Sequence, residues 1–175
     1  MLDLKNVADY FFDDINRNIT LKIGIMLESG HRVLFVCIHN SARSQMAEAF
    51  LNTYGEGKFK AESAGLEPGK MNPHVIKVML EVGIDLSKKE TQGVFDLLRK
   101  GAQYDAVVTV CDEASAEQCP IFPGSGKRIS WSFEDPSGLR GTEEEVLQHT
   151  RDIRDKIALA IRDFIKESGV VSYWL

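Results

Sequence analysis

The sequence predicts an α/β fold in three layers, with helices on both faces of a central four-stranded parallel sheet, and an N-terminal helical extension in front of it. Two observations lead to this fold class. Short apolar runs alternate with segments of helical periodicity, which is typical of parallel sheets. The first of these runs, residues 33–36, is apolar throughout and suits a strand buried on both faces. We expect residues 31–175 to form this domain and residues 1–30 to form the extension.

The extension carries a regular apolar pattern. Within residues 3–29, apolar side chains recur at spacings of three and four, which predicts one amphipathic helix or two helices interrupted near Asn18. Such a stripe is usually a packing surface. It would lie either against the main domain or against a second copy of the chain, and the latter would make a homodimer through this helix.

The first half of the domain continues from strand to helix and back. A helix is expected from Arg43 to Gly55, and residues 58–63 have the composition of a second strand. Asn72 is placed to cap a helix that begins at Pro73 and ends at Gly83. The inner face of that helix is expected to consist of Val75, Ile76, Met79 and Leu80.

The second half repeats the alternation. Residues 94–100 predict a short helix, residues 106–110 a strongly buried strand and residues 128–130 a weaker one. Thr142, followed by the acidic residues 143–145, caps a long final helix. Its apolar stripe is Val146, Ile153, Ile157, Ile161, Phe164 and Ile165. Right-handed crossovers then bring the carboxyl ends of the strands to one edge of the sheet, where ligands bind in such folds.

Composition narrows the class of protein. The chain has 175 residues, of which 43% are hydrophobic and 27% charged, enough for one domain with a substantial core. A net charge of −5 argues against nucleic acid as a partner. No apolar run has the length of a membrane span, and the N-terminus lacks a signal-peptide core. Three cysteines in a chain of this size favour reactive thiols in a reducing cytoplasm over disulfide staples.

A cysteine at the end of the first strand and an arginine at the start of the next helix predict an oxyanion-binding loop. Cys37 and Arg43 enclose five residues, Ile38, His39, Asn40, Ser41 and Ala42. A loop at a helix N-terminus turns backbone N–H groups inward and adds the positive end of the helix dipole. Arg43 adds a planar fork of donors, and the combined field favours the thiolate, the nucleophilic form of Cys37. Asn40 tolerates the left-handed backbone that such a loop needs. The alternative is a buried, inert Cys37.

The other two cysteines stand close together in the sequence. Cys111 follows the strand at residues 106–110, so it is expected at the same sheet edge as Cys37, and Cys119 comes after seven mostly polar or small residues. Residues 112–118 have the composition of a mobile surface segment or a short helix. Zinc is a poor alternative because the cysteines lack paired close spacing and have no histidine beside them, so no metal is predicted. Two independent structural cysteines remain the other interpretation.

Residues 37–48, CIHNSARSQMAE, resemble the active-site loop and first helix of the low-molecular-weight protein tyrosine phosphatases, and more closely those of their relatives, the thioredoxin-coupled arsenate reductases. Further matches occur in family order: Ser63-Ala64-Gly65, Asn72-Pro73, Gly83-Ile84-Asp85, Val107 to Cys111, Cys119-Pro120 and Trp131 to Pro136. The resemblance covers roughly residues 32 to 167, and it implies the fold expected above.

The resemblance implies reduction of arsenate by a relay of three thiols. Cys37 would attack arsenic, Cys111 would attack the Cys37 sulfur as arsenite leaves, and Cys119 would move the disulfide to the Cys111–Cys119 pair. Thioredoxin would then reduce that disulfide, and no bound cofactor is needed.

Two further residues match positions with a family role. Asp135, followed by Pro136, resembles the general acid that protonates the leaving oxygen, and its alternative is an ordinary Asp-Pro turn. Where the tyrosine phosphatases carry aromatic residues after this pair, Ser137 and Gly138 stand here, which favours a small inorganic oxyanion. Ser44 is expected to hydrogen-bond the Cys37 sulfur, or else to be only a first-turn helix residue.

One family feature is in doubt. Some relatives bind a monovalent cation near the loop through an Asn, a Glu, a Ser and an Asp. Asn40, Glu48 and Ser63 match the first three, but Gln92 and Gly93 stand where the aspartate is expected, so no potassium site is predicted.

Two other functions stay open. The first is a tyrosine phosphatase whose later cysteines protect Cys37 from overoxidation by forming a reversible disulfide. The second is a non-catalytic oxyanion or redox sensor that docks a partner through residues 1–30.

Overall fold

The computed structural model describes residues 30–111, 117–124 and 126–168. Within these ranges the chain forms a four-stranded parallel sheet in the order β2-β1-β3-β4. The strands are β1 (His31–Cys37), β2 (Phe59–Gly65), β3 (Ala106–Thr109) and β4 (Lys127–Ser130). This confirms the predicted fold class for the described part of the chain.

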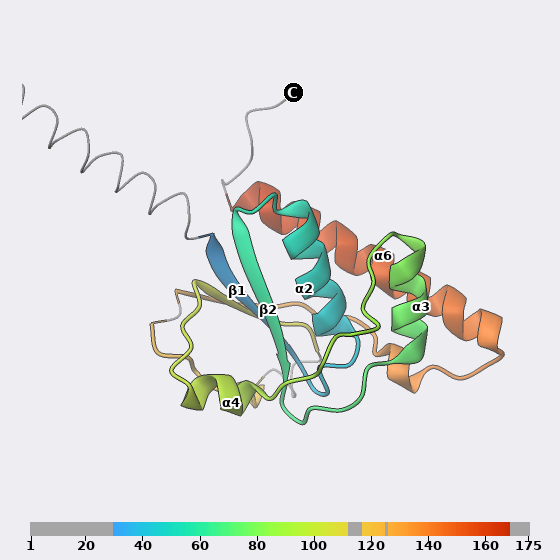
Figure 1. Cartoon of the computed structure of the whole chain (residues 1–175), viewed down its shortest axis with the longest axis horizontal. Coiled ribbons are helices and arrows are strands. Elements are labelled where there is room, and N and C mark those ends of the chain that lie inside the picture. Colours follow the sequence, from blue (N-terminus) through green and yellow to red (C-terminus); the bar gives the residue numbers. More distant parts are fainter. Residues whose placement is uncertain (1–29, 112–116, 125, 169–175) are drawn as a thin grey trace, which may run out of the picture. The chain divides into compact units, whose positions relative to one another are not determined.

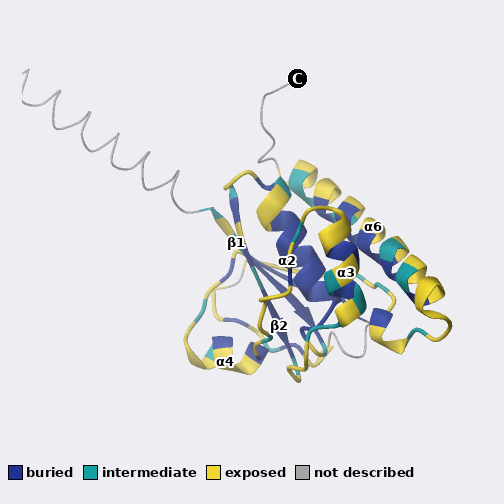
Figure 2. Cartoon of the chain, turned by 45° about the vertical axis from the view of Figure 1, so that its right-hand side comes forward, coloured by how far each residue is buried: buried dark blue, intermediate teal, exposed yellow. Residues whose placement is uncertain are grey.

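Helices cover both faces of the sheet (Figure 1). On one side lie α2 (Arg43–Tyr54), α3 (Pro73–Glu81) and α6 (Glu143–Glu167), and on the other lies α4 (Val94–Arg99). β1 is buried from Val33 to Cys37, and alternate residues face opposite cores. Val33, Phe35 and Cys37 pack with α2 and α6, whereas Leu34 and Val36 pack on the α4 side. In this layer α2 is buried from Arg43 to Leu51, whereas α3 and α6 turn buried faces inward and exposed faces outward (Figure 2).

Local capping explains where two of these helices begin. The Asn72 side chain accepts the N–H groups of His74 (2.9 Å) and Val75 (3.4 Å), and Pro73 occupies the first helical turn. Thr142 and Glu145 form a reciprocal capping box at the start of α6. Both starts were predicted from the sequence. A short 3-10 turn, η1 (Pro136–Gly138), precedes α6.

The inner face of α3 was predicted only in part. Val75 and Met79 are buried and Ile76 is half-buried, but Leu80 is 59% exposed and Val78 is buried in its place. The cause is the position of α6, which packs against α3 from the side where Val78 lies; Arg154 of α6 donates to the Val78 carbonyl oxygen at 2.8 Å. In a nine-residue helix with apolar side chains on several faces, the sequence pattern does not determine which face is covered.

Two expectations lie outside the described residues. They are the N-terminal helix with its expected dimer contact and the character of residues 112–116. In the part of the chain that is described, no helix combines the length and the apolar character that crossing a membrane requires.

Candidate active site

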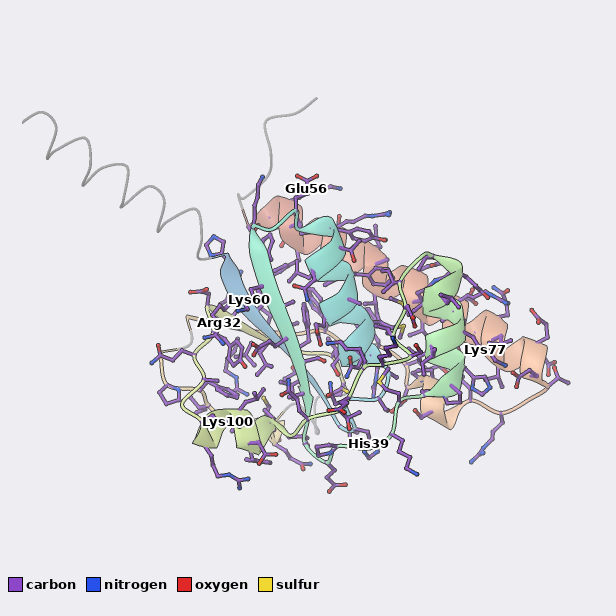
Figure 3. All side chains as sticks on the ribbon, in the orientation of Figure 1. Arg32, His39, Glu56, Lys60, Lys77 and Lys100 are labelled. Atoms are coloured by element: carbon purple, nitrogen blue, oxygen red, sulfur yellow. The ribbon has the colours of Figure 1, made fainter. Side chains whose placement is uncertain are left out.

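Cys37 and Cys111, two of the predicted site residues, lie at the carboxyl edge of the sheet. Cys37 is the last residue of β1, and Cys111 follows the end of β3 by two positions. The ladder between these strands extends past β3, because the Val110 N–H donates to the Val36 carbonyl at 2.8 Å. Figure 3 places His39, in the loop after β1, at this edge, where its side chain is exposed.

The loop from residue 38 to 42 turns its carbonyl groups outward. The carbonyl oxygens of Cys37, Ile38 and His39 accept N–H groups of the segment 66–69, at 2.8–3.1 Å. Because a trans peptide points its C=O and N–H in opposite directions, each such bond directs the next N–H toward the loop interior. The Asn40 N–H follows this rule and donates to the Cys37 Sγ at 3.2 Å. The loop is therefore built to surround an anion with donors.

Buried polar side chains support the sulfur from below. Ser44 Oγ lies 2.9 Å from Cys37 Sγ, in the position predicted for it. The Asn40 side-chain amide donates to Ser44 Oγ at 3.1 Å and to Ser63 Oγ at 2.8 Å. Asn40 has a φ of 52°, the left-handed conformation that the sequence predicted. Cys37 and Asn40 are almost completely buried, and Cys37 contacts both these polar groups and the apolar core on the α2 side of the sheet.

Arg43 connects this loop to the loop before η1. Its side chain is 5% exposed, and Nη2 lies 2.6 Å from Asp135 Oδ2 while Nη1 donates to the Phe133 carbonyl at 3.0 Å. Arg43 Nε is buried without a partner. An unpaired buried donor is costly, so this nitrogen is a ready contact for an oxyanion.

Asp135 forms the ordinary Asp-Pro turn that was one of its two interpretations, and it also contacts Arg43. Its Oδ1 accepts the Ser137 N–H at 2.9 Å, which makes the ordinary Asp-Pro turn, while Oδ2 faces Arg43. The Asp135 side chain is 34% exposed, so it lies at the mouth of the loop with access to solvent.

Gly65 is a site residue that the sequence reasoning did not single out. It ends β2 and pairs with Cys37. A Cβ at this position would lie 2.8 Å from the Asn40 nitrogen and the Ile38 carbonyl oxygen. These are backbone atoms that cannot move aside, so the anion loop requires a residue without a side chain, glycine, at position 65. Its place in a family-like triplet was the only available signal.

The second and third cysteines are buried as well. Cys111 borders a cavity of about 530 Å³ together with Arg128 and Glu117. Cys119 packs in the smaller core on the α4 side, and burial raises the pKa of its thiol while the positive charge of Arg128 opposes this rise. Arg128 Nη2 also donates to the Cys119 carbonyl oxygen at 3.3 Å.

In the described ranges, no three side chains of His, Cys, Asp and Glu are grouped so as to hold a metal ion. The donors around Cys37 are amides, hydroxyls and a guanidinium, a set that suits an anion.

Comparison with known proteins agrees with this geometry. Residues 32–168 match the family described as low molecular weight phosphotyrosine protein phosphatase. The chain is 39% identical over 132 residues to an arsenate reductase of Bacillus subtilis, covering 75% of this chain and 93% of that protein. A solved structure described as an arsenate reductase in the phosphate binding state has a TM-score of 0.63 at 32% identity, covering 78% of this chain and 98% of that one. The thioredoxin-dependent arsenate reductase of Corynebacterium glutamicum has a TM-score of 0.54 at 24% identity, covering 93% and 77% of the two chains, a likeness that bears on the fold alone.

Proposed function

The chain belongs to the low molecular weight phosphotyrosine protein phosphatase family, and from this premise we propose that it reduces arsenate to arsenite by a relay of three thiols that thioredoxin regenerates. The observation that carries the proposal is the Cys37 sulfur, held by the Asn40 N–H and Ser44 Oγ at the sheet edge that Cys111 also reaches. A hydrolase needs only the first thiol, whereas arsenate reduction also uses the second and the third.

In the first step the Cys37 thiolate attacks arsenic. A sulfur–arsenic bond forms, an arsenic–oxygen bond breaks, and Asp135 protonates the departing oxygen, which leaves as water. Arg43 and the inward N–H groups of the loop hold the remaining oxygens. Arg43 follows the loop directly in the sequence, and its side chain contacts Asp135.

In the second step the Cys111 thiolate attacks the Cys37 sulfur. The sulfur–arsenic bond breaks, its electron pair stays on arsenic, and arsenic(V) becomes arsenic(III), which leaves as arsenite. The two sulfurs are oxidised to the Cys37–Cys111 disulfide. The Cys119 thiolate then attacks Cys111, the Cys37 thiolate is released, and the dithiol of thioredoxin reduces the Cys111–Cys119 disulfide.

The test is the Cys119→Ser variant with arsenate, thioredoxin, thioredoxin reductase and NADPH. We expect multiple turnover to stop after one equivalent of arsenite, with the Cys37–Cys111 disulfide accumulating. Hydrolysis of an aryl phosphate should remain at its wild-type rate, because it needs only the loop and Asp135. Sustained thioredoxin-driven reduction in this variant would contradict the relay.

A weaker phosphatase activity is expected beside the reductase activity, because phosphate and arsenate share shape and charge and the loop accepts both. Phosphotyrosine hydrolysis as the main function is the second candidate, favoured by the name of the matching family. Ser137 and Gly138 argue against it, since neither offers a ring platform for a phosphotyrosine.

A further inference from the structure

A lysine pairs with a buried carboxylate behind the anion loop. The Glu48 side chain of α2 is 9% exposed, and its Oε1 forms an ion pair with Lys89 Nζ. The other carboxylate oxygen, Oε2, accepts the Ser63 hydroxyl at 2.6 Å. Burying a carboxylate away from water is costly unless a positive charge pairs with it. Lys89 supplies that charge.

The Glu48 carboxylate ends a chain of hydrogen bonds that runs to Cys37 with a consistent direction throughout. Because Ser63 donates to Glu48, it accepts from the Asn40 side-chain amide at 2.8 Å. The second hydrogen of that amide goes to Ser44 Oγ at 3.1 Å. Ser44 thus accepts from Asn40, and its own hydroxyl hydrogen is available to the Cys37 sulfur at 2.9 Å.

The orientation of Asn40 is fixed from its other side. Its Oδ1 accepts the backbone N–H of Gln92 at 2.9 Å and the Gln45 side-chain amide at 3.2 Å. The Gln92 side chain donates to the Ser63 carbonyl oxygen at 2.9 Å. These contacts occupy Asn40 Oδ1 and the Ser63 carbonyl oxygen.

The same residues bear on the monovalent cation that the family resemblance implies. Asn40 Oδ1 already accepts two hydrogen bonds, and the oxygens of Glu48 are taken by Lys89 and Ser63. Gln92, in the place of the fourth ligand, presents an amide and no charge. This arrangement does not fit a bound metal ion. We propose that Lys89 takes the place of that cation within the chain and, through Glu48, acts as a positioning residue for Asn40 and Ser44 beneath the Cys37 sulfur.

This inference rests on Cys37 as the reacting thiol, and it can be tested without arsenate. Alkylation of Cys37 by iodoacetamide at pH 7, followed by mass spectrometry of the peptide, reports how well the thiolate is supported. The wild-type protein should be alkylated at the same rate in potassium chloride and in choline chloride of equal ionic strength, because it needs no free potassium ion. Lys89→Met should react roughly tenfold more slowly, because the hydrogen-bond donors beneath the sulfur are then held less firmly. Lys89→Arg should stay near wild type because it keeps the charge.

The matched control is Lys88→Met, which removes a neighbouring exposed lysine and should leave the rate unchanged. If Lys89→Met is unstable, the double variant Glu48→Gln with Lys89→Met should recover part of the lost Tm, because it removes the buried charge together with its partner. Equal alkylation of Lys89→Met and wild type in choline chloride would overturn the proposal. So would acceleration of the wild-type reaction by potassium, since a free cation would then be doing what is assigned to Lys89.

Discussion

Asp135 Oδ2 lies 2.6 Å from Arg43 Nη2, so the arginine of the anion loop is paired with a carboxylate 92 residues away. The pair joins the start of α2 to the turn before α6, and the bond from Arg43 Nη1 to the Phe133 carbonyl oxygen reinforces this connection. In the proposed reaction, an oxyanion bound through the same guanidinium would compete with Asp135 and would place its departing oxygen next to that carboxylate.

Asp135→Asn tests this arrangement. The amide keeps the size of the side chain but cannot donate a proton as an acid. We expect kcat for arsenate reduction to fall by roughly 10²- to 10⁴-fold, the usual contribution of a general acid. Phosphate should bind the variant at least as tightly as wild type, because a competing negative charge beside Arg43 is gone. Steady-state kinetics with phosphate as a competitive inhibitor measures both kcat and the affinity for phosphate.

The control is Glu134→Gln, at the exposed neighbouring position, which should change neither quantity. Unaltered turnover of Asp135→Asn would count against Asp135 as the general acid.

Ser44→Ala removes one of the two donors that contact the Cys37 sulfur. A hydrogen bond to a charged group contributes about 1.5–3 kcal/mol, so alkylation of Cys37 at neutral pH should slow by roughly 10- to 100-fold. Arsenate turnover should fall by a similar factor. Ser44→Thr keeps the hydroxyl and should retain more activity than the alanine variant. Equal reactivity of all three proteins would mean that the 2.9 Å contact plays no part in holding the thiolate.

Gly65→Ala should damage the loop without removing any functional side chain. The added methyl group would lie 2.8–2.9 Å from backbone atoms of residues 38–40, closer than van der Waals contact permits. We expect loss of nearly all activity and weaker phosphate binding, because the loop must move away from β2. Gly69→Ala is the matched control, since its Cβ would meet the His39 Cβ at an ordinary 3.5 Å. Comparable activity of the two variants would contradict the tight packing at position 65.

The outcome for these residues shows what sequence can and cannot provide. Cys37, Asn40 and Ser44 were predictable because strand, loop and helix N-terminus are consecutive, so local geometry determines their contacts. Gly65 and Lys89 act on the same loop from distant segments, through sheet register and an ion pair that no local pattern encodes. The exposure of Leu80 has the same origin, because the position of α6 decides which face of α3 is covered.

The contact between α3 and α6 predicts a pH effect on stability. Hydrogen bonds from Arg151 hold the pKa of Glu81 below its ordinary value, and Arg154 adds to this. A carboxyl whose pKa is lower in the folded state stabilises the fold above its unfolded pKa, and this contribution is lost as pH falls through the folded value. Glu81→Gln should therefore unfold at lower urea concentration at pH 7 and show a flatter decline toward acid. The same change at exposed Glu167 should leave the curve unchanged, and parallel pH curves for Glu81→Gln and wild type would exclude the effect.

The attack of Cys119 on the Cys37–Cys111 disulfide should be the most pH-sensitive step that the chain's own thiols carry out. Burial raises the pKa of the Cys119 thiol above its usual range, so few molecules carry the thiolate at neutral pH. The rate of Cys111–Cys119 disulfide formation should then rise by about tenfold per pH unit through the neutral range, while the earlier steps change less. Rapid acid quenching of a single turnover, followed by mapping of the disulfides, resolves the two stages.

The positive charge of Arg128 favours the Cys119 thiolate, so Arg128→Gln should slow the attack of Cys119 roughly threefold at pH 8, and Arg128→Lys should preserve its rate. A rate independent of pH between about 6 and 9 would instead mean that release of Cys119 from the core formed by Val36, Tyr104 and Phe122 limits the exchange, and not its ionisation.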